Sequence, residues 1–400
     1  MKVEARSGCA LPGVLAAALL TAACDGGGTE PQVAEVTVVP EEALIVGEGG
    51  GQRFVAFAYD AGGKTVTAAA EWSVDRPGVA EISSRGFTTG RANGVTTVTA
   101  TIGGVAATAR LEVYVPRVIT DYEPGQRYYG RRDYVEYIPG ELPLVLASSH
   151  GGRLVPDEIP DRSYGVFRND LNSLELTLAM RQALIDLTGQ APHVILSHLH
   201  RIKLDANREI EEAAQDSPYA EQAWREFHDW LVTARATVSA DFERGLFLDI
   251  HGHGHDIDRL ELGYLLTSAE LNRPDANLNS LDIVARTSIR ELGRTSPIPF
   301  SQLLRGPVSL GGLFQEHDIP SVPSPAVPGP GDDPYFRGGY NTRRHGSLSD
   351  AEVIDGIQIE HHYRGIRDND ANRQAYAAIA AAVIREFMLE HYGFFEADSR

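Results

Sequence analysis

Between residue 33 and about residue 115, apolar and polar residues alternate in short segments. Segments such as AEVTVV, RFVAFAYD, VTTVTATI and ARLEVYV have a period of two, and turns containing Gly, Asp and Pro separate them. A period of two is typical of strands with one buried face, and many short strands at this spacing predict a β-sandwich. We therefore expect an all-β domain over residues 33–116.

From about residue 122 the pattern changes to apolar strand runs that alternate with helical periodicity. The expected strands are LPLVLASSH, APHVILSHLH, LFLDIHGHG and GIQIEHHY, and the helices between and after them are amphipathic. This alternation predicts an α/β domain over residues 122–396, with a mixed sheet and helices on both faces. The Pro-rich stretch IPSVPSPAVPGPGDDP is expected to be a long loop, of the kind that is often functional.

The first 24 residues have the features of an export signal. Their apolar core, LPGVLAAALL, is too short to span a membrane as a mature helix. The ending LTAAC resembles the lipobox of bacterial lipoproteins, with Cys24 as the lipidated residue, although plain cleavage nearby is the alternative. Residues 25–32, DGGGTEPQ, are expected to be a flexible tether. The sequence thus predicts an exported protein, periplasmic or at the cell surface, that contacts the membrane only through a lipid anchor.

Composition restricts the chemistry further. The formal charge of −19 and the pI near 5.1 argue against a nucleic-acid partner, which requires clustered basic residues. Cys9 and Cys24 are the only cysteines, and Cys9 would leave with the signal. Any metal must therefore be held by His, Asp or Glu rather than by thiolates. The sequence does not indicate an oligomeric state.

Histidines follow three of the expected strands where those strands end. They are His150 in SSH, His198 in HLHR and His251 in DIHGHG. Ligands of open α/β sheets bind beyond the carboxyl ends of the strands, so these side chains can converge on one pocket. A lone His in such a place is more often a hydrogen-bonding residue, and His253 and His255 are expected to orient ligands or substrate rather than to bind metal.

The stretch EWSVDRPGVAEISSRGFTTGRANGVTTVTATIGGVAATARLEV resembles bacterial Ig-like domains of group 2. The resemblance includes the Trp-Ser pair of a central strand, Trp72 and Ser73, and a closing valine-rich strand. It implies an Ig-like sandwich that acts as a spacer or adhesion module and carries no catalytic residues.

Six segments occur in an order that resembles the N-formylglutamate amidohydrolase family. They are SSHGGRLVPDEIPDR, NDLNSLELTLA, HRIKLDANRE, DIHGHG, FRGGYNTRRHGS and IQIEHHYRG. The resemblance covers about 250 residues. It implies a fold similar to that of zinc carboxypeptidases and aspartoacylases, which use a His, Glu and His zinc site, an Asn-Arg pair for the substrate carboxylate and a late-strand Glu as general base.

The resemblance implies that His150 and His251 bind a Zn²⁺ or another divalent metal. The second ligand remains open, because Arg153 stands three residues after His150, where carboxypeptidase-type sites have Glu. Glu158 in PDEIP and Asp170 in RNDLNS are the two candidates.

The resemblance also assigns catalytic roles. Glu360 in IQIEHH occupies the position of the general base, where partial desolvation would raise its pKa. The alternative is an exposed strand Glu that alternates with inward isoleucines. Arg201 is expected to supply positive charge to the developing oxyanion.

Substrate contacts are expected from two segments. Asn207 and Arg208 of DANR match the carboxylate-binding pair, although Arg208 has an alternative role in a surface ion pair with Glu209 or Glu212. In GGYNTRRHG, which resembles the family's substrate loop, Gly338 and Gly339 would permit close approach of the backbone to the ligand. Arg343 and Arg344 would bind an anionic substrate, or else form a solvated basic pair in a turn.

These features together predict an exported metal-dependent hydrolase. The substrate would be an N-acyl amino acid or a peptide with a free carboxylate, and export favours cell-wall or environmental peptides over formylglutamate. An alternative is a surface-anchored binding or adhesion lipoprotein with an inactive hydrolase-like domain.

Overall fold

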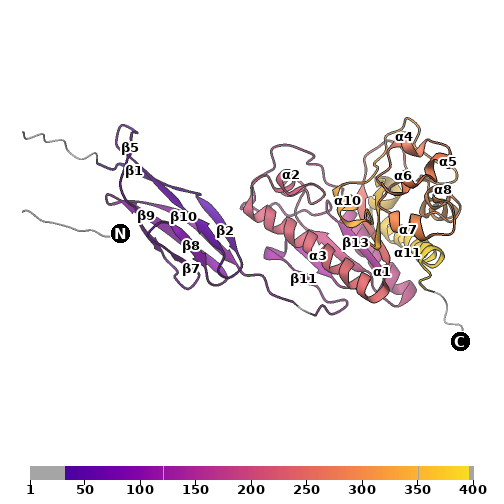
Figure 1. Cartoon of the computed structure of the whole chain (residues 1–400), viewed down its shortest axis with the longest axis horizontal. Helices are drawn as coiled ribbons and strands as arrows, with labels where there is room; N and C mark the ends of the chain where they lie inside the picture. The colour runs from indigo at the N-terminus through magenta and orange to yellow at the C-terminus, as the bar shows by residue number, and fades with distance from the viewer. Residues whose placement is uncertain (1–31, 120, 350, 396–400) are drawn as a thin grey trace, which may run out of the picture.

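The computed structural model describes residues 32–119, 121–349 and 351–395. An N-terminal β region and a larger α/β region lie one after the other along the long axis of the molecule (Figure 1). The expected export signal, Cys24 and residues 25–31 of the expected tether lie outside the described residues. Within the described residues, no helix has both the length and the apolar character needed to cross a bilayer.

The N-terminal β region consists of small sheets, as the period-two pattern predicts. Their strand orders are β1-β4-β5, β2-β10-β9-β6 and β3-β8-β7. Inward residues such as Val98, Ala100 and Leu111 form its core. The strands are β1 Glu35–Val39, β2 Glu42–Val46, β3 Gly51–Arg53, β4 Val55–Tyr59, β5 Thr65–Val66, β6 Glu71–Val74, β7 Ala80–Ile82, β8 Phe87–Gly90, β9 Gly94–Ile102 and β10 Val105–Tyr114.

An eight-stranded mixed sheet forms the centre of the α/β region, with the order β11-β12-β14-β13-β15-β18-β16-β17. Neighbours from β14 through β13 and β15 to β18 are parallel, whereas β16 runs antiparallel to β18. The strands are β11 Tyr128–Tyr129, β12 Val135–Ile138, β13 Leu144–Ser148, β14 His193–Ser197, β15 Gly245–Gly252, β16 Leu260–Gly263, β17 Ser321–Val322 and β18 Ile354–His361.

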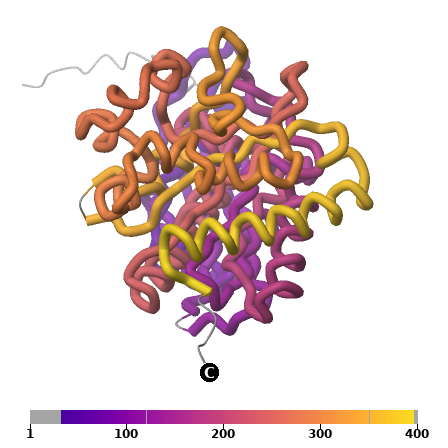
Figure 2. The backbone as a smooth tube through the Cα atoms, turned by 90° about the vertical axis from the view of Figure 1, so that its right-hand side faces the viewer, coloured from indigo at the N-terminus to yellow at the C-terminus, as the bar shows by residue number. Residues whose placement is uncertain are grey.

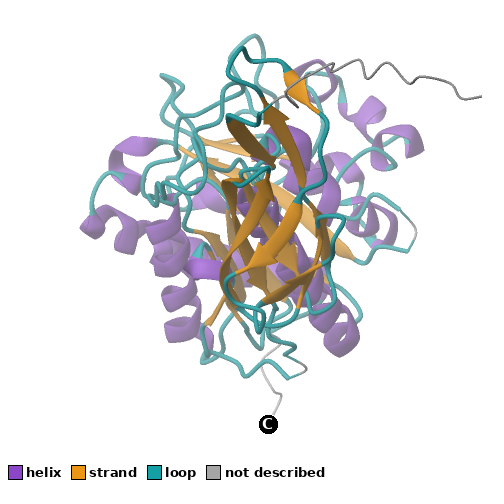
Figure 3. Cartoon of the chain, turned by 90° about the vertical axis from the view of Figure 1, so that its left-hand side faces the viewer, coloured by secondary structure: helices purple, strands orange, loops and turns teal. Residues whose placement is uncertain are grey.

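Helices cover both faces of this sheet, as the sequence predicts (Figure 3). On one face α1 Ser173–Thr188 and α11 Asp370–Tyr392 pack against a core that contains Leu246, Leu248 and Ile250 of β15. On the other face α3 Pro218–Phe242 packs against a core that contains Phe247. Figure 2 shows α11, in yellow, running across the end of the molecule that faces away from the β region.

The shorter helices lie in the connections. They are η1 Arg131–Asp133, α2 Ile210–Ala214, α4 Ser268–Leu271, α5 Asp275–Leu278, α6 Leu281–Val284, α7 Arg290–Thr295, α8 Phe300–Arg305, α9 Leu310–Glu316, α10 Tyr340–His345 and the π-helical turn η2 Tyr363–Arg367. The long helices begin and end at recognisable signals: Ser217 caps the start of α3, and Gly189, with φ +77°, follows the end of α1.

A buried ion-pair network joins the two regions. The Arg131 guanidinium contacts Glu112 of β10 at 2.7 Å and Glu158 at 2.6 Å. Beside it, Tyr219 of α3 donates a hydrogen bond to Glu42 of β2 over 2.9 Å. Because Arg131 is only 3% exposed, this contact is part of the folded interior rather than a surface encounter.

Candidate metal centre

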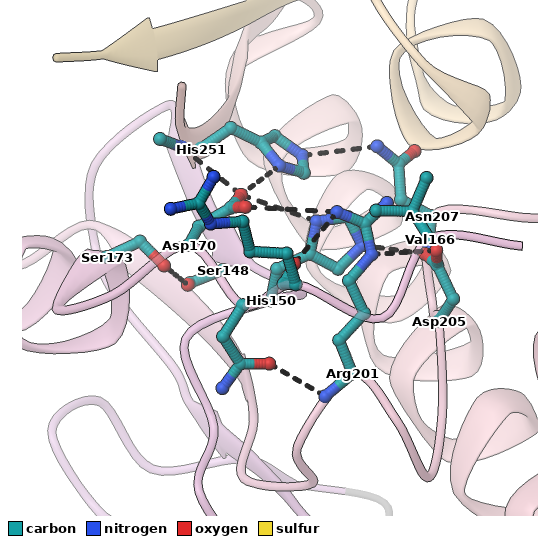
Figure 4. Close-up of polar contacts among 12 residues, drawn as sticks. Ser148, His150, Val166, Asp170, Ser173, Arg201, Asp205, Asn207 and His251 are labelled. Carbon is teal, nitrogen blue, oxygen red and sulfur yellow. Dashed lines mark hydrogen bonds and ion pairs between the residues drawn. The ribbon is translucent and has the colours of Figure 1, made fainter. Parts of the chain in front are cut away.

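The sheet brings two of the predicted histidines together. His150 follows the end of β13 and His251 lies near the end of the adjacent parallel strand β15, and their ring centroids are 4.8 Å apart. Oδ2 of Asp170 lies 2.9 Å from Nδ1 of His251 and 3.3 Å from Nδ1 of His150 (Figure 4). These buried residues form a group whose ligand atoms all lie within 4.8 Å of one another.

Backbone contacts hold Asp170 in this position. The loop that contains it leads into α1, and its amide donates to the carbonyl of His150 over 3.1 Å. The amide of Gly252 donates to Asp170 Oδ2 over 3.2 Å. At the start of α1, the hydroxyl of Ser173 contacts that of Ser148, at the end of β13, at 3.1 Å. The carboxylate is therefore fixed between the two strand ends.

A second carboxylate lies behind each imidazole. Nε2 of His150 lies 2.6 Å from Oδ1 of Asp205, and Nε2 of His251 lies 3.0 Å from Oδ2 of Asp249. Histidines that bind metal usually donate their remote N–H to a carboxylate or carbonyl, which fixes the ring orientation and leaves the other nitrogen for the metal. Here both Nδ1 atoms face Asp170, and Nε2 of His150 meets Asp205. Nε2 of His251 lies near Asp249 without a hydrogen bond to it, and its hydrogen-bond partner is Nδ2 of Asn207.

The electrostatics of the group favour a cation. Burial raises the pKa of Asp170, but the charge of His150 and hydrogen bonds with His150 and His251 outweigh burial and place that pKa well below its usual range. Burial lowers the pKa of His251, but the charge of Asp249 and the hydrogen bond with Asp170 raise it well above its usual range. Two imidazole nitrogens and a carboxylate oxygen are a donor set that Zn²⁺ commonly takes, and these residues fit such an ion.

Glu360 lies beside this group. It is directly opposite His251 in the parallel pairing of β15 and β18, and Gln358 donates a hydrogen bond to its Oε1 over 2.9 Å. Glu360 is only 6% exposed, so the alternative of an exposed strand residue does not hold. Burial raises the pKa of Glu360 to about 8; nearby Asp170 and Glu261 raise it too, whereas the charge of His251 opposes the shift.

A cavity of about 660 Å³ opens onto the group. Its apolar walls include Val166, Leu171, Phe336 and Tyr363. All four are large hydrophobic residues that are exposed to solvent. Its polar lining consists of the side chains or backbone of His150, Arg168, Asn169, Asp170, Arg201, Asn207, Arg208, His251, Gly252, His253, Gly254, His255, Gly338, Gly339, Gln358, Glu360 and Arg367.

The predicted substrate-binding pair lines this cavity. Asn207 Nδ2 lies 3.3 Å from His251 Nε2, and its Oδ1 accepts a hydrogen bond from the amide of Asn341 over 2.8 Å. Arg208 lines the cavity and also forms an ion pair with Glu212 at 3.3 Å. Both arrangements expected for this side chain are therefore found together. Arg201 donates from Nε to Asp205 over 2.8 Å, and its Nη1 lies 3.9 Å from Asp170.

The glycine-rich loop lies at the cavity only in part. Gly338 has φ +114°, and a Cβ added at Gly339 would lie 2.5 Å from Nδ2 of Asn207, so the close approach needs glycine there. The two arginines that were expected to bind an anion do not line the cavity. Arg344 lies over the ring of Trp224 and donates to the hydroxyl of Tyr340, while Arg343 is exposed on α10.

Glu158 lies outside the metal-ligating group. Its carboxylate accepts hydrogen bonds from Arg131 over 2.6 Å and from Tyr134 over 2.7 Å. It belongs to the network between the two regions, and Asp170 is the carboxylate that meets His150 and His251.

The sequence interpretation missed Asp205 and Asp249. Both had a signal: Asp249 stands two residues before His251, so strand alternation places the two on one face, and Asp205 belongs to the DANR motif. Arg168 and Arg367, which also line the cavity, had none that distinguishes them from surface arginines.

No protein-family model matches the chain, and no curated protein sequence matches it. Among solved structures, N-formylglutamate amidohydrolase from Ralstonia eutropha JMP134 is similar at 14% identity and a TM-score of 0.38, over 64% of this chain and 97% of that one. A gene product of Agrobacterium tumefaciens is similar at 13% identity and a TM-score of 0.39, over 64% and 94%. Both are distant similarities of fold.

The N-terminal part is similar to domains of the S-layer protein SbsC. The structure of SbsC domains 4 and 5 matches at 20% identity and a TM-score of 0.20, over 21% of this chain. The chain covers 53%, about half, of that structure.

Proposed function

We propose that this protein is a metal-dependent hydrolase that cleaves an amide bond of an N-acyl amino acid or a peptide-like substrate with a free carboxylate. One observation carries the proposal: His150, Asp170 and His251 meet in a buried group beside Glu360, at the wall of a cavity large enough for such a substrate. The distant similarity in fold to an N-formylglutamate amidohydrolase is consistent with it.

His150, Asp170 and His251 would hold the ion. When bound, Zn²⁺ or a similar divalent ion supplies Lewis-acid activation of a water molecule and polarises a carbonyl oxygen. Asp205 orients the imidazole of His150 from behind, and Asp205 and Asp249 offset the positive charge in the buried group.

Glu360 is the proposed general base. Its side chain lines the cavity next to His251, and the hydrogen bond from Gln358 fixes its orientation. With a pKa of about 8, only part of this carboxyl group is ionised at neutral pH, and a cation bound beside it would increase the ionised fraction. The ionised form can accept a proton from the attacking water and pass it to the departing amine.

Arg208 and Asn207 are the proposed contacts for the substrate carboxylate. A guanidinium offers two parallel N–H groups to a carboxylate, and Asn207 is held rigidly by the amide of Asn341. Arg201 lies on the same wall and adds positive charge near the group, where an oxyanion would form.

We also propose that the protein is exported and anchored through a lipid on Cys24, with the β region as a spacer between membrane and hydrolase. This rests on the sequence of residues 1–32 alone. Replacing Cys24 with Ser should move the protein from the detergent phase to the aqueous phase in a phase-separation assay, and a variant that still enters the detergent phase would contradict the anchor.

The hydrolytic activity can be tested with a panel of N-formyl, N-acetyl and longer N-acyl amino acids and short peptides. We expect turnover that is lost in a chelator and restored by Zn²⁺. Glu360→Gln should reduce kcat by about 10²- to 10⁴-fold. His317→Ala, a change of an exposed histidine outside the cavity, should behave like the wild type. Undiminished turnover in a metal-free preparation would rule the mechanism out.

A further inference from the structure

A second cluster of His and Glu side chains lies next to the same cavity. His253 and His255 follow the end of β15, and Glu261 belongs to β16. Their ligand atoms all lie within 4.8 Å of one another, and none of the three belongs to the His150, Asp170 and His251 group. Both histidines line the cavity. We propose that His253, His255 and Glu261 form a second site for a divalent metal ion.

Backbone groups hold the far side of two of these ligands. Nε2 of His253 donates to the carbonyl of Arg259 over 2.8 Å, and its Nδ1 accepts a hydrogen bond from the amide of His255 over 3.2 Å. Nδ1 is thus the nitrogen that would exchange this hydrogen bond for the ion. Oε2 of Glu261 accepts from the amide of Phe336 over 2.8 Å, which leaves Oε1 toward His255. This is the arrangement by which outer hydrogen bonds orient metal ligands.

His255 completes the set. Its ring stacks on Phe336, with centroids 4.7 Å apart and an interplanar angle of 7°. Its Nδ1 lies 2.8 Å from Oε1 of Glu261. Two imidazoles and one carboxylate form the same N₂O donor set as the first group, which suits Zn²⁺ and neighbouring first-row ions.

The charge of Glu261 supports a cation at this point. Its side chain is fully buried, and the arginine that pairs with it, Arg259, comes no closer than 4.0 Å. Arg259 is also shared with Asp333, at 3.2 Å. A buried carboxylate is costly unless its charge is balanced, and an ion between Glu261 and the two imidazoles would balance it.

The strand register separates the two sites. His251 of β15 is opposite Glu360 of β18, and Glu360 is opposite Glu261 of β16, so the three side chains form a row on one face of the sheet. Neighbouring strands are about 4.8 Å apart, so His251 and Glu261 are separated by roughly 10 Å at the backbone. The second ion would thus lie on the other side of Glu360 and would not share a ligand with the first. It would add positive charge to the cavity near Phe336, where an anionic group of a substrate would bind.

Zinc stoichiometry tests this inference. The purified full chain would be stripped with a chelator and titrated with Zn²⁺ by calorimetry, and its zinc content measured after desalting. We expect two zinc ions per chain in the wild type and in the control His317→Ala, and one in His255→Ala and in Glu261→Gln. Glu261→Gln keeps the shape of the buried side chain, and circular dichroism would verify the fold of each variant.

Variants of the first site distinguish a failure of the proposed second site from a failure of the metal site on which the proposed function depends. His150→Ala should retain one zinc ion, at the second site, and His150→Ala with His255→Ala should retain none. One ion in the wild type that persists in His255→Ala and Glu261→Gln but not in His150→Ala would overturn the second site and leave the proposed function intact. That result would mean that His255 and Glu261 form only a hydrogen-bonded pair. A wild type that binds only one ion, and keeps it in His150→Ala but not in His255→Ala, would instead contradict the first site.

Discussion

At the scale of residues, the candidate metal centre depends on carboxylates that do not touch the metal position. Asp205 receives hydrogen bonds from both His150 and Arg201, at 2.6 and 2.8 Å, and is fully buried. It therefore determines which nitrogen of His150 faces Asp170. Arg201 acts on the group through Asp205 as well as through its place in the cavity wall.

Asp205→Asn should weaken zinc binding at the first site by about 10- to 100-fold, because the remote nitrogen of His150 would lose its charged acceptor. Competition with a chelating dye would measure the affinity. Asp186→Asn, a change of an acidic residue at the exposed side of α1, is the matched control. An Asp205→Asn protein with the zinc affinity of the wild type would show that this carboxylate does not orient a ligand.

The sequence could predict residues that stand directly at strand ends. His150, His251 and Glu360 do so, and all three line one cavity. The sequence could not show whether Glu158 or Asp170 is the second metal ligand, because that depends on which loop lies beside the ends of β13 and β15. Asp170 lies there because its amide donates a hydrogen bond to the carbonyl of His150. Glu158 lies elsewhere and accepts hydrogen bonds from Arg131 and Tyr134.

At the scale of elements, β18 carries a buried carboxyl group near each of its ends. Glu360 lies at its carboxyl end beside the metal centre, and Asp355 lies near its start, where it accepts hydrogen bonds from Ser347, Tyr392 and the amide of Leu292. Burial raises the pKa of Asp355 to about 7 despite these hydrogen bonds. The hydrogen bonds that link Asp355 to α7 and to the end of α11 favour the ionised form, but burial outweighs them and makes the ionised form costly in the folded protein.

The pKa of Asp355 is higher in the folded than in the unfolded protein, so its contribution to stability is fully present below about pH 4 and is lost as the pH rises to about 7. Asp355→Asn cannot ionise. Its free energy of unfolding, relative to the wild type, should thus increase between pH 4 and 7, as urea denaturation at several pH values would measure. A difference between the two proteins that does not vary with pH would contradict this assignment.

The element pattern was predictable where periodicity is strong. The helices α1, α3 and α11 and the strands β13, β14, β15 and β18 all fall in segments that the sequence marks clearly. The antiparallel strand β16 was not anticipated, since its residues Leu260–Gly263 follow the histidine-rich loop without a turn signal of their own. Its position next to β18 is what brings Glu261 opposite Glu360.

At the scale of the whole molecule, the β region and the α/β region share a buried contact. Arg131 joins Glu112 of the first region to Glu158 of the second, and it also lies over the ring of Tyr219, 4.3 Å from its centroid. Individual residues of this network carry no pattern in the sequence that distinguishes them from surface charges, so the contact could not be predicted.

Arg131→Met should destabilise the protein by about 1–3 kcal/mol, because Glu112 and Glu158 each lose a hydrogen-bonded buried partner. The loss is only partial, since Arg110 still pairs with Glu112 and Tyr134 still donates to Glu158. Scanning calorimetry should then show a lower and less cooperative transition. Arg91→Met, which removes an exposed ion pair with Glu81, should change stability by less than about 1 kcal/mol. Equal effects of the two substitutions would mean that the two regions are not coupled through Arg131.

The proposed function depends on the binding of one divalent ion by His150, Asp170 and His251. Anomalous diffraction at the zinc edge, from crystals grown with Zn²⁺, tests it most directly. We expect an anomalous peak at about 2.0–2.2 Å from a nitrogen of each histidine and from an oxygen of Asp170. Crystals that show these three side chains in hydrogen-bonded contact, with no anomalous peak between them, would contradict it.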